Sequence, residues 1–77
     1  MGTAMYKPGD MLYVVLRNTK GRVSWQGELP VYKVKGQHMW FRHTSHASYK
    51  ADMHTLNILN TPGKVYHSKE EWERELN

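Results

Sequence analysis

The stretch VYKVKGQHMWFRH, residues 31–43, decides the predicted fold because it holds the clearest hairpin signal in the chain. Gly36-Gln37 fits a two-residue type II′ turn, in which glycine takes the first position. Pairing the flanking residues outward from this turn predicts the register of two antiparallel strands. The expected cross-strand pairs are Lys35 with His38, Val34 with Met39, Lys33 with Trp40 and Tyr32 with Phe41.

Side chains alternate between the two faces of a strand, so this register predicts one apolar face and one basic face. The apolar face, expected to join the core, contains Tyr32, Val34, Met39 and Phe41. The basic face contains Lys33, Lys35, His38, Trp40 and Arg42. A slip of one residue would mix the two sets, and this favours the register over its neighbours.

Further strands are expected on both sides of the hairpin. Residues 11–16, MLYVVL, form an all-apolar run of strand length, which predicts a strand that is central or covered on both faces. The other expected elements are a strand at 23–26 that is interrupted at Gly27, a loop at 44–51, and strands at 55–59 and 64–67. Turns containing Pro-Gly at residues 7–10 and 60–63 separate these elements.

A helix is predicted over residues 68–76. Ser68 and Glu71 match the S-x-x-E capping box that marks a helix N-terminus. Trp72 and Leu76, four residues apart, form an apolar stripe along the helix. A helix of about nine residues does not persist alone in water. Trp72 is therefore expected to dock on the rest of the domain or on a partner.

The order of these elements predicts a mainly β protein. Five or six short strands separated by Pro/Gly turns are typical of a small barrel. The expected fold is an SH3-like partly open barrel of five or six strands with a short C-terminal helix, and an OB-like arrangement is the alternative. Residues 6–77 are expected to form this single domain, and residues 1–5 a disordered tail or a cloning remnant.

The composition of the chain restricts its function classes. The 77 residues carry a formal net charge of +4 and contain no cysteine, which excludes a disulfide scaffold, a thiolate zinc site and a cysteine nucleophile. No run approaches the roughly 18 apolar residues of a membrane span, and the first residues lack the features of a signal peptide. A reducing cytoplasm is the expected location.

Charge is unevenly distributed along the chain. Residues 1–67 contain nine Lys or Arg and three Asp or Glu, a net charge of +6, whereas residues 68–77 contain two and four, a net charge of −2. The β-rich body is therefore more basic than the average indicates, and it carries the acidic helix at one end.

The basic face of the hairpin is the strongest functional signal. An indole flanked by cations combines a platform for base stacking with charge that neutralises phosphates. This pattern predicts binding of DNA or RNA through Lys33, Lys35, His38, Trp40 and Arg42. Trp25, in an expected loop or sheet edge beside Gly27, is a further candidate anchor for a partner. The alternatives are that Trp40 packs beneath the helix against Trp72, and that Trp25 caps an open end of the barrel.

Three stretches of the chain carry a resemblance to a known family. YKPGD at residues 6–10, leading into LYVV at 12–15, looks like the opening of many SH3-like barrel domains. Residues 31–40 and 63–72 resemble the layout of small SH3-like (KOW-like) barrel proteins encoded by phages and prophages. The resemblance covers most of residues 6–76, and it departs from the usual Val-Gly before the hairpin turn. It brings no agreed activity, and it implies an accessory protein acting in the host cytoplasm.

A second class of partner follows from the aromatic content. Three Trp, five Tyr and one Phe are many for a small domain, and Tyr and Trp are enriched at protein interfaces. The alternative function is therefore a protein–protein interaction module that docks on and modulates a host protein. The opposite charges of the body and the helix also permit self-association.

The chain contains five histidines, which are candidate metal ligands. His43 and His46 have a spacing that would suit one shared cation, with His54 or Asp52 as a third ligand, but without a thiolate the pattern favours histidines that bind no metal. No nucleophile elbow, phosphate-binding loop or zinc-protease motif occurs. A non-enzymatic protein without a cofactor is expected.

Overall fold

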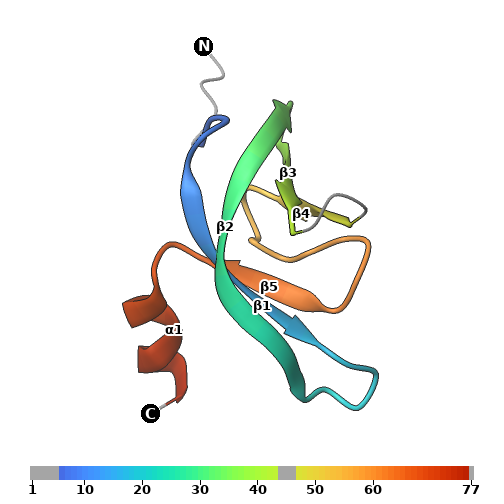
Figure 1. Cartoon of the computed structure of the whole chain (residues 1–77), viewed down its shortest axis with the longest axis vertical. Coiled ribbons are helices and arrows are strands. Elements are labelled where there is room, and N and C mark those ends of the chain that lie inside the picture. Colours follow the sequence, from blue (N-terminus) through green and yellow to red (C-terminus); the bar gives the residue numbers. More distant parts are fainter. Residues whose placement is uncertain (1–5, 44–46, 77) are drawn as a thin grey trace.

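Five antiparallel strands and one helix form the fold, seen in a computed structural model that describes residues 6–43 and 47–76 (Figure 1). The elements are β1 (Met11–Arg17), β2 (Val23–Lys35), β3 (His38–Arg42), β4 (Ser48–Asp52), β5 (Gly63–Tyr66) and α1 (Lys69–Leu76). The strand order in the sheet is β4-β3-β2-β1-β5. The sheet curls into a half-barrel, so the expectation of a small, SH3-like, partly open barrel is confirmed.

β1 is buried on both faces, as its all-apolar sequence predicts. It lies between β2 and β5 in the sheet. Leu12, Val14 and Leu16 point into the main core inside the curl. Tyr13 and Val15, on the opposite face, pack in a second cluster with side chains from β5 and α1. Two separate apolar layers therefore meet on this one strand.

β2 is longer than the sequence indicates. The short strand expected at 23–26 runs on without interruption through Gly27 to Lys35. Its first part pairs with β1 and its last part with β3, so this one strand connects the two halves of the curled sheet. Gly27 does not break the strand, because it pairs with Val14 of β1 like its neighbours. A Cβ at this position would lie 2.8 Å from the Trp25 ring. The glycine makes room for that indole over the backbone.

The β2–β3 hairpin has the predicted turn and most of the predicted register. Gly36 has a φ of 61°, which a glycine adopts without the steric cost of a Cβ. Three of the four predicted pairs are confirmed: Lys35 with His38, Val34 with Met39 and Lys33 with Trp40.

The fourth pair is wrong. The register shifts between Val31 and Lys33, and Val31 rather than Tyr32 pairs with Phe41. An irregularity of this kind places two residues of one strand opposite one residue of its partner. Val31 therefore enters the core and is 1% exposed, whereas Tyr32, expected in the core, is 37% exposed.

Two segments after the hairpin also differ from the prediction. The loop expected at 44–51 contains β4, which pairs with β3 along its whole length; residues 44–46 lie outside the described residues. The strand expected at 55–59 is instead an irregular link that forms isolated bridges from Ala51 to Ile58 and from Asn57 to Lys64. It is not a strand because Leu56 has a φ of 64°, outside the β region. The link draws the two edges of the sheet, β4 and β5, toward each other.

The C-terminal helix starts as predicted. Ser68 Oγ accepts a hydrogen bond from the backbone N–H of Glu71, and Glu71 Oε1 accepts one from the backbone N–H of His67. Trp72 is buried against Tyr66 of β5, whereas Leu76, expected to share its stripe, is 63% exposed. α1 has eight residues, and no helix within the described ranges has the length and apolar character needed to cross a membrane.

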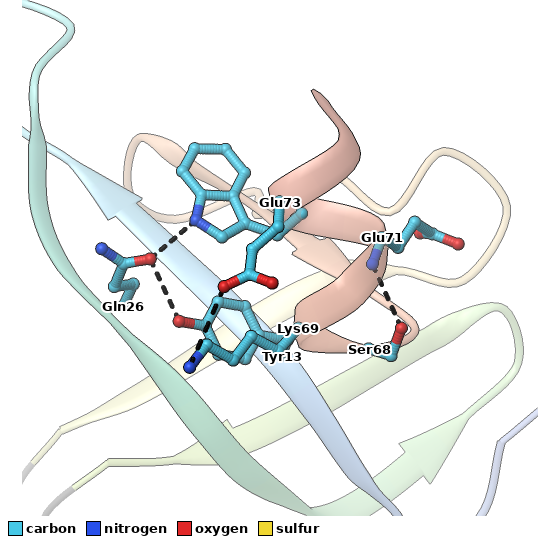
Figure 2. A network of polar contacts seen from close by, with 7 residues as sticks. Tyr13, Gln26, Ser68, Lys69, Glu71 and Glu73 are labelled. Atoms are coloured by element: carbon cyan, nitrogen blue, oxygen red, sulfur yellow. Dashed lines mark hydrogen bonds and ion pairs between the residues drawn. The ribbon is translucent and has the colours of Figure 1, made fainter. Parts of the chain in front are cut away.

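A hydrogen-bonded group fixes the position of the helix on the sheet. Gln26 of β2 accepts two hydrogen bonds on its Oε1: one from the Tyr13 hydroxyl at 3.0 Å and one from the Trp72 indole N–H at 2.6 Å. Figure 2 shows Gln26 and Tyr13 facing the helix, with the Ser68 cap at the start of α1. Because the indole N–H is satisfied, Trp72 is buried without the cost of an unpaired donor.

Folding stability is expected to fall in strong alkali because of Tyr66. Burial, together with the hydrogen bond that its hydroxyl donates to Glu75, raises the pKa of Tyr66 from 10.0 to about 12. The folded state therefore favours the neutral phenol. The stability that this contributes is complete below pH 10 and is lost as the pH rises toward 12. Urea denaturation across this range should show the loss, and Tyr66→Phe should reduce it; an equally steep loss in Tyr66→Phe would contradict the assignment.

Candidate functional site

An indole lies between two lysines in the middle of the three-stranded part of the sheet. Trp40 of β3 pairs with Lys33 of β2 on one side and with Lys50 of β4 on the other. Lys33 Nζ is 4.9 Å from the centre of the Trp40 ring, and Lys50 Nζ is 5.6 Å from it. Both ammonium groups are within the range in which a cation is attracted by an aromatic ring. The half-buried indole and the two cations thus form one row across three strands.

A second aromatic ring with a cation lies next to this row. The guanidinium of Arg42 is 4.6 Å from the centre of the Tyr32 ring. Arg42 is two residues from Trp40 on β3, so strand alternation puts both side chains on the same outer face. The outward position of Tyr32 follows from the bulge. The structure therefore adds the Tyr32 ring to a face on which Trp40 was the only Trp, Tyr or Phe predicted.

The turn end of the face carries both charge signs. Lys35 and His38 pair across β2 and β3, and His38 pairs with Asp52 of β4. The His38 and Trp40 rings approach edge to face, with centres 6.3 Å apart. The Asp52 carboxylate accepts hydrogen bonds from the backbone N–H groups of His54 and Thr55.

These hydrogen bonds at Asp52 have an electrostatic consequence. They lower the pKa of the Asp52 carboxyl because they stabilise its charged form. Oδ2 also accepts a hydrogen bond from the Gln37 side chain at 3.0 Å. The negative charge is therefore stabilised by the backbone N–H groups of His54 and Thr55 and by the Gln37 side chain.

Lys50 lies beside Trp40 because β4 pairs with β3, and the link after β4 forms hydrogen bonds to the other edge of β4. Asn60 Oδ1 accepts a hydrogen bond from the Lys50 backbone N–H at 3.0 Å, and Asn60 Nδ2 donates one to the Ser48 carbonyl at 3.2 Å. The backbone N–H of Leu59 donates to the Lys50 carbonyl at 2.7 Å. These contacts satisfy backbone groups on the outer edge of β4 that would otherwise be open to another strand.

Sequence reasoning missed Lys50 because residues 44–51 were expected to form a loop. A weak signal was present: Tyr49 and Ala51 alternate with polar residues at 48, 50 and 52, which is a two-residue period. Tyr49 packs against the main core and Ala51 is fully buried, so the alternation is real. The face as observed comprises Tyr32, Lys33, Lys35, His38, Trp40, Arg42 and Lys50, and it is called the basic aromatic face below.

Trp25, the remaining predicted site residue, is not brought to this face. It lies in the first part of β2 and packs, half-buried, against the main core. Its ring packs against His43 with ring centres 4.3 Å apart and the planes tilted by 40°, and the His43 ring centre is 6.0 Å from that of Tyr49. Trp25 therefore packs on the core, whereas Trp40 faces outward.

The alternative packing for Trp40 does not occur. The helix lies over β1 and β5, where Trp72 contacts Tyr66 with ring centres 5.2 Å apart. β3 is on the other side of β2 in the sheet, toward the opposite edge (Figure 1). The indole of Trp40 is therefore covered by its flanking lysines rather than by α1.

The histidines lie at separate places within the described residues. His38 belongs to the basic aromatic face and His43 to the Trp25 cluster, His67 contacts Tyr6, and His54 is exposed. His46 lies outside the described residues. Among residues 6–43 and 47–76, no three His, Asp or Glu side chains are grouped as a metal ion would require.

The fold and this face define a small SH3-like partly open barrel with a basic aromatic surface on β2, β3 and β4. No protein-family model, curated protein or solved structure matches the chain.

Proposed function

We propose that the protein is a non-enzymatic, cytoplasmic accessory module that binds nucleic acid through the basic aromatic face. The observation that supports this most directly is the row in which Trp40 lies between Lys33 and Lys50. Nucleic-acid sites on small β folds combine an aromatic ring on which a base stacks with cations that follow the phosphates. Here one ring and two cations occupy neighbouring positions on adjacent strands.

The energetics favour release of the lysines toward a ligand. A cation beside an exposed or half-exposed aromatic ring contributes only about 0.5–1 kcal/mol. A base stacked on the same ring contributes about 1–3 kcal/mol, and each neutralised phosphate releases counterions as well. A nucleic acid can therefore replace the weak lysine–indole contacts of the free protein with stronger ones, while the lysines move to phosphate oxygens.

The charge distribution supports the same orientation. Lys33, Lys35, Arg42 and Lys50 lie on β2, β3 and β4, whereas the four glutamates of the chain's last ten residues lie on α1, against β1 and β5. A polyanion is thus attracted more strongly to the β4 edge of the sheet than to the edge that carries α1. The +4 net charge understates the positive potential over the basic aromatic face.

Binding is expected to weaken with salt in proportion to the cations of the face. Fluorescence anisotropy of a labelled oligonucleotide measures the binding affinity at each of several salt concentrations. The logarithm of the affinity is then plotted against the logarithm of the salt concentration. For a single strand, each phosphate contact contributes about −0.7 to the slope of this plot, so four cations that each contact one phosphate predict a slope near −3. Lys50→Ala should reduce the magnitude of this slope by about 0.7.

Lys20→Ala is the matched control. Lys20 is exposed in the loop between β1 and β2, at the opposite end of β2 from the hairpin, and its loss changes the net charge as much. It should leave the slope unchanged if the contacts are local to the face. Equal slopes for the two variants, or no binding to DNA or RNA at low salt, would contradict the proposal. A partner captured from nuclease-treated lysate by wild type, and lost in Lys50→Ala, would favour a protein as the ligand instead.

A further inference from the structure

Two aromatic rings with their own cations lie on the outer face of β3 and its neighbour β2. Trp40 is flanked by Lys33 and Lys50, and Tyr32 is covered by Arg42. Trp40 and Arg42 are two residues apart on one strand. Because Arg42 shares the face of Trp40 and contacts the Tyr32 ring, the two rings lie on one surface rather than in separate patches.

We propose that the basic aromatic face takes single-stranded nucleic acid in preference to a duplex, with unstacked bases on Trp40 and on Tyr32. This inference rests on the proposed function and specifies its ligand. Tyr32 is thereby a binding residue, although its place in the sequence pattern predicted a core residue.

The spacing of the two positions favours a strand whose bases are separated. Trp40 and Arg42, whose guanidinium lies over the Tyr32 ring, are two residues apart on β3, so their backbone positions are about 6.8 Å apart. Successive bases in a duplex strand are separated by only about 3.4 Å. Neighbouring bases that remain stacked on each other would not each cover one ring of this face. A flexible single strand can extend until two of its bases reach the two rings.

The width of the face disfavours entry into a groove. The major groove of DNA, about 12 Å wide, admits a helix or a two-stranded ribbon. Trp40 lies on the middle strand of three, with β2 and β4 on either side (Figure 1). At about 4.8 Å between strands, the three backbones alone span about 10 Å before side chains are added. A base paired inside a duplex could not reach the indole across this surface, whereas an unpaired base can.

The bulge makes the second ring accessible. Without the register shift between Val31 and Lys33, Tyr32 would pair with Phe41 and point into the core. With the shift, Tyr32 is 37% exposed and the exposed Arg42 side chain lies over its ring. The planar guanidinium can remain stacked between the ring and a base, or it can turn to a phosphate.

The test compares one oligonucleotide sequence in three forms. A labelled DNA single strand of about 12 nucleotides, its RNA equivalent and the matching DNA duplex are titrated by anisotropy at one salt concentration. At least tenfold tighter binding of the single strands is expected. Trp40→Ala and Tyr32→Ala should each weaken single-strand binding by about 5- to 150-fold and leave duplex binding nearly unchanged.

Tyr32→Phe is the matched control, because it keeps the ring and removes only the hydroxyl. It should bind single strands like wild type. Thermal unfolding of each variant verifies that the fold is intact, as expected for a side chain as exposed as Tyr32. Equal affinity for the duplex, or wild-type affinity in Tyr32→Ala, would overturn the inference while leaving nucleic-acid binding in place. Absence of binding to all three forms would overturn the proposed function as well.

Discussion

Replacement of Trp72 by alanine is expected to lower the free energy of unfolding by about 3–5 kcal/mol. Trp72 is 3% exposed and joins α1 to a cluster that includes Tyr13, Val15 and Tyr66. Its indole N–H is also one of the two donors to Gln26. A chain of this length has a total stability of about 4–12 kcal/mol, so this single change is expected to remove a large part of it. Urea denaturation, or thermal unfolding where the variant is too unstable, measures the loss.

Two further variants of α1 test whether the loss of stability in Trp72→Ala comes from the buried indole. Leu76→Ala removes an apolar side chain that is 63% exposed, and it should change the stability by less than about 0.5 kcal/mol. Trp72→Phe keeps a ring in the cluster but leaves the Gln26 oxygen with one donor fewer, so its cost should lie between those of the other two variants. Similar losses for Trp72→Ala and Leu76→Ala would show that α1 is not anchored through the indole.

Gly63→Ala is expected to destabilise the protein by about 3 kcal/mol, the upper end of the usual cost of overpacking. A Cβ at this position would lie 2.6 Å from the carbonyl oxygen of Val15 and 3.0 Å from a methyl carbon of Ile58. The first of these atoms belongs to the backbone of β1, which is hydrogen-bonded on both sides and cannot move away. The pairing of β1 with β5 should therefore be lost or shifted, and the melting temperature should fall accordingly.

Gly27→Ala provides the matched comparison. A Cβ there would also be too close to its neighbour, at 2.8 Å, but the neighbour is the outer part of the Trp25 ring rather than backbone. A side chain can rotate at lower cost than a paired strand can shift. Gly27→Ala should therefore cost less than Gly63→Ala. An equal or greater cost would contradict the explanation by backbone contact.

The elements with strong local signals were predicted correctly. β1 is an apolar run whose two faces are both covered, the Gly36-Gln37 turn joins β2 to β3, and Ser68 caps α1. Each of these depends on residues close together in the chain: a run of β-forming side chains, a glycine at a positive φ, or a hydroxyl near a free backbone N–H. Tertiary context did not override any of them.

The elements that depend on distant partners were not predicted correctly. β4 has a modest strand signal, and it forms because β3 offers an edge and because Asn60 and Leu59 satisfy its other side. The strand expected at 55–59 has a comparable sequence, but the backbone turns at Leu56, where the N–H donates to the Asp52 carbonyl. Residue preferences of similar strength thus led to opposite structures.

The candidate site divides in the same way. Lys33, Lys35, His38, Trp40 and Arg42 were identified from the hairpin pattern, and the structure places them together on one surface. Lys50 and Tyr32 were not identified, although they supply one of the cations beside Trp40 and the second ring. Both depend on features that neighbouring residues signal weakly or not at all: the pairing of β4 with β3, and the bulge in β2.

The sequence by itself determined which side chains can share a strand face and where the chain turns, because alternation and turn chemistry act over a few neighbouring residues. Only the tertiary structure decided that Tyr32 faces outward and that Lys50 lies beside Trp40. The physical reason is that a curled sheet must fill its core and satisfy the backbone of every strand at once. Val31 fills the core in place of Tyr32, and β4 takes the free edge of β3, because partners far apart in the chain require it.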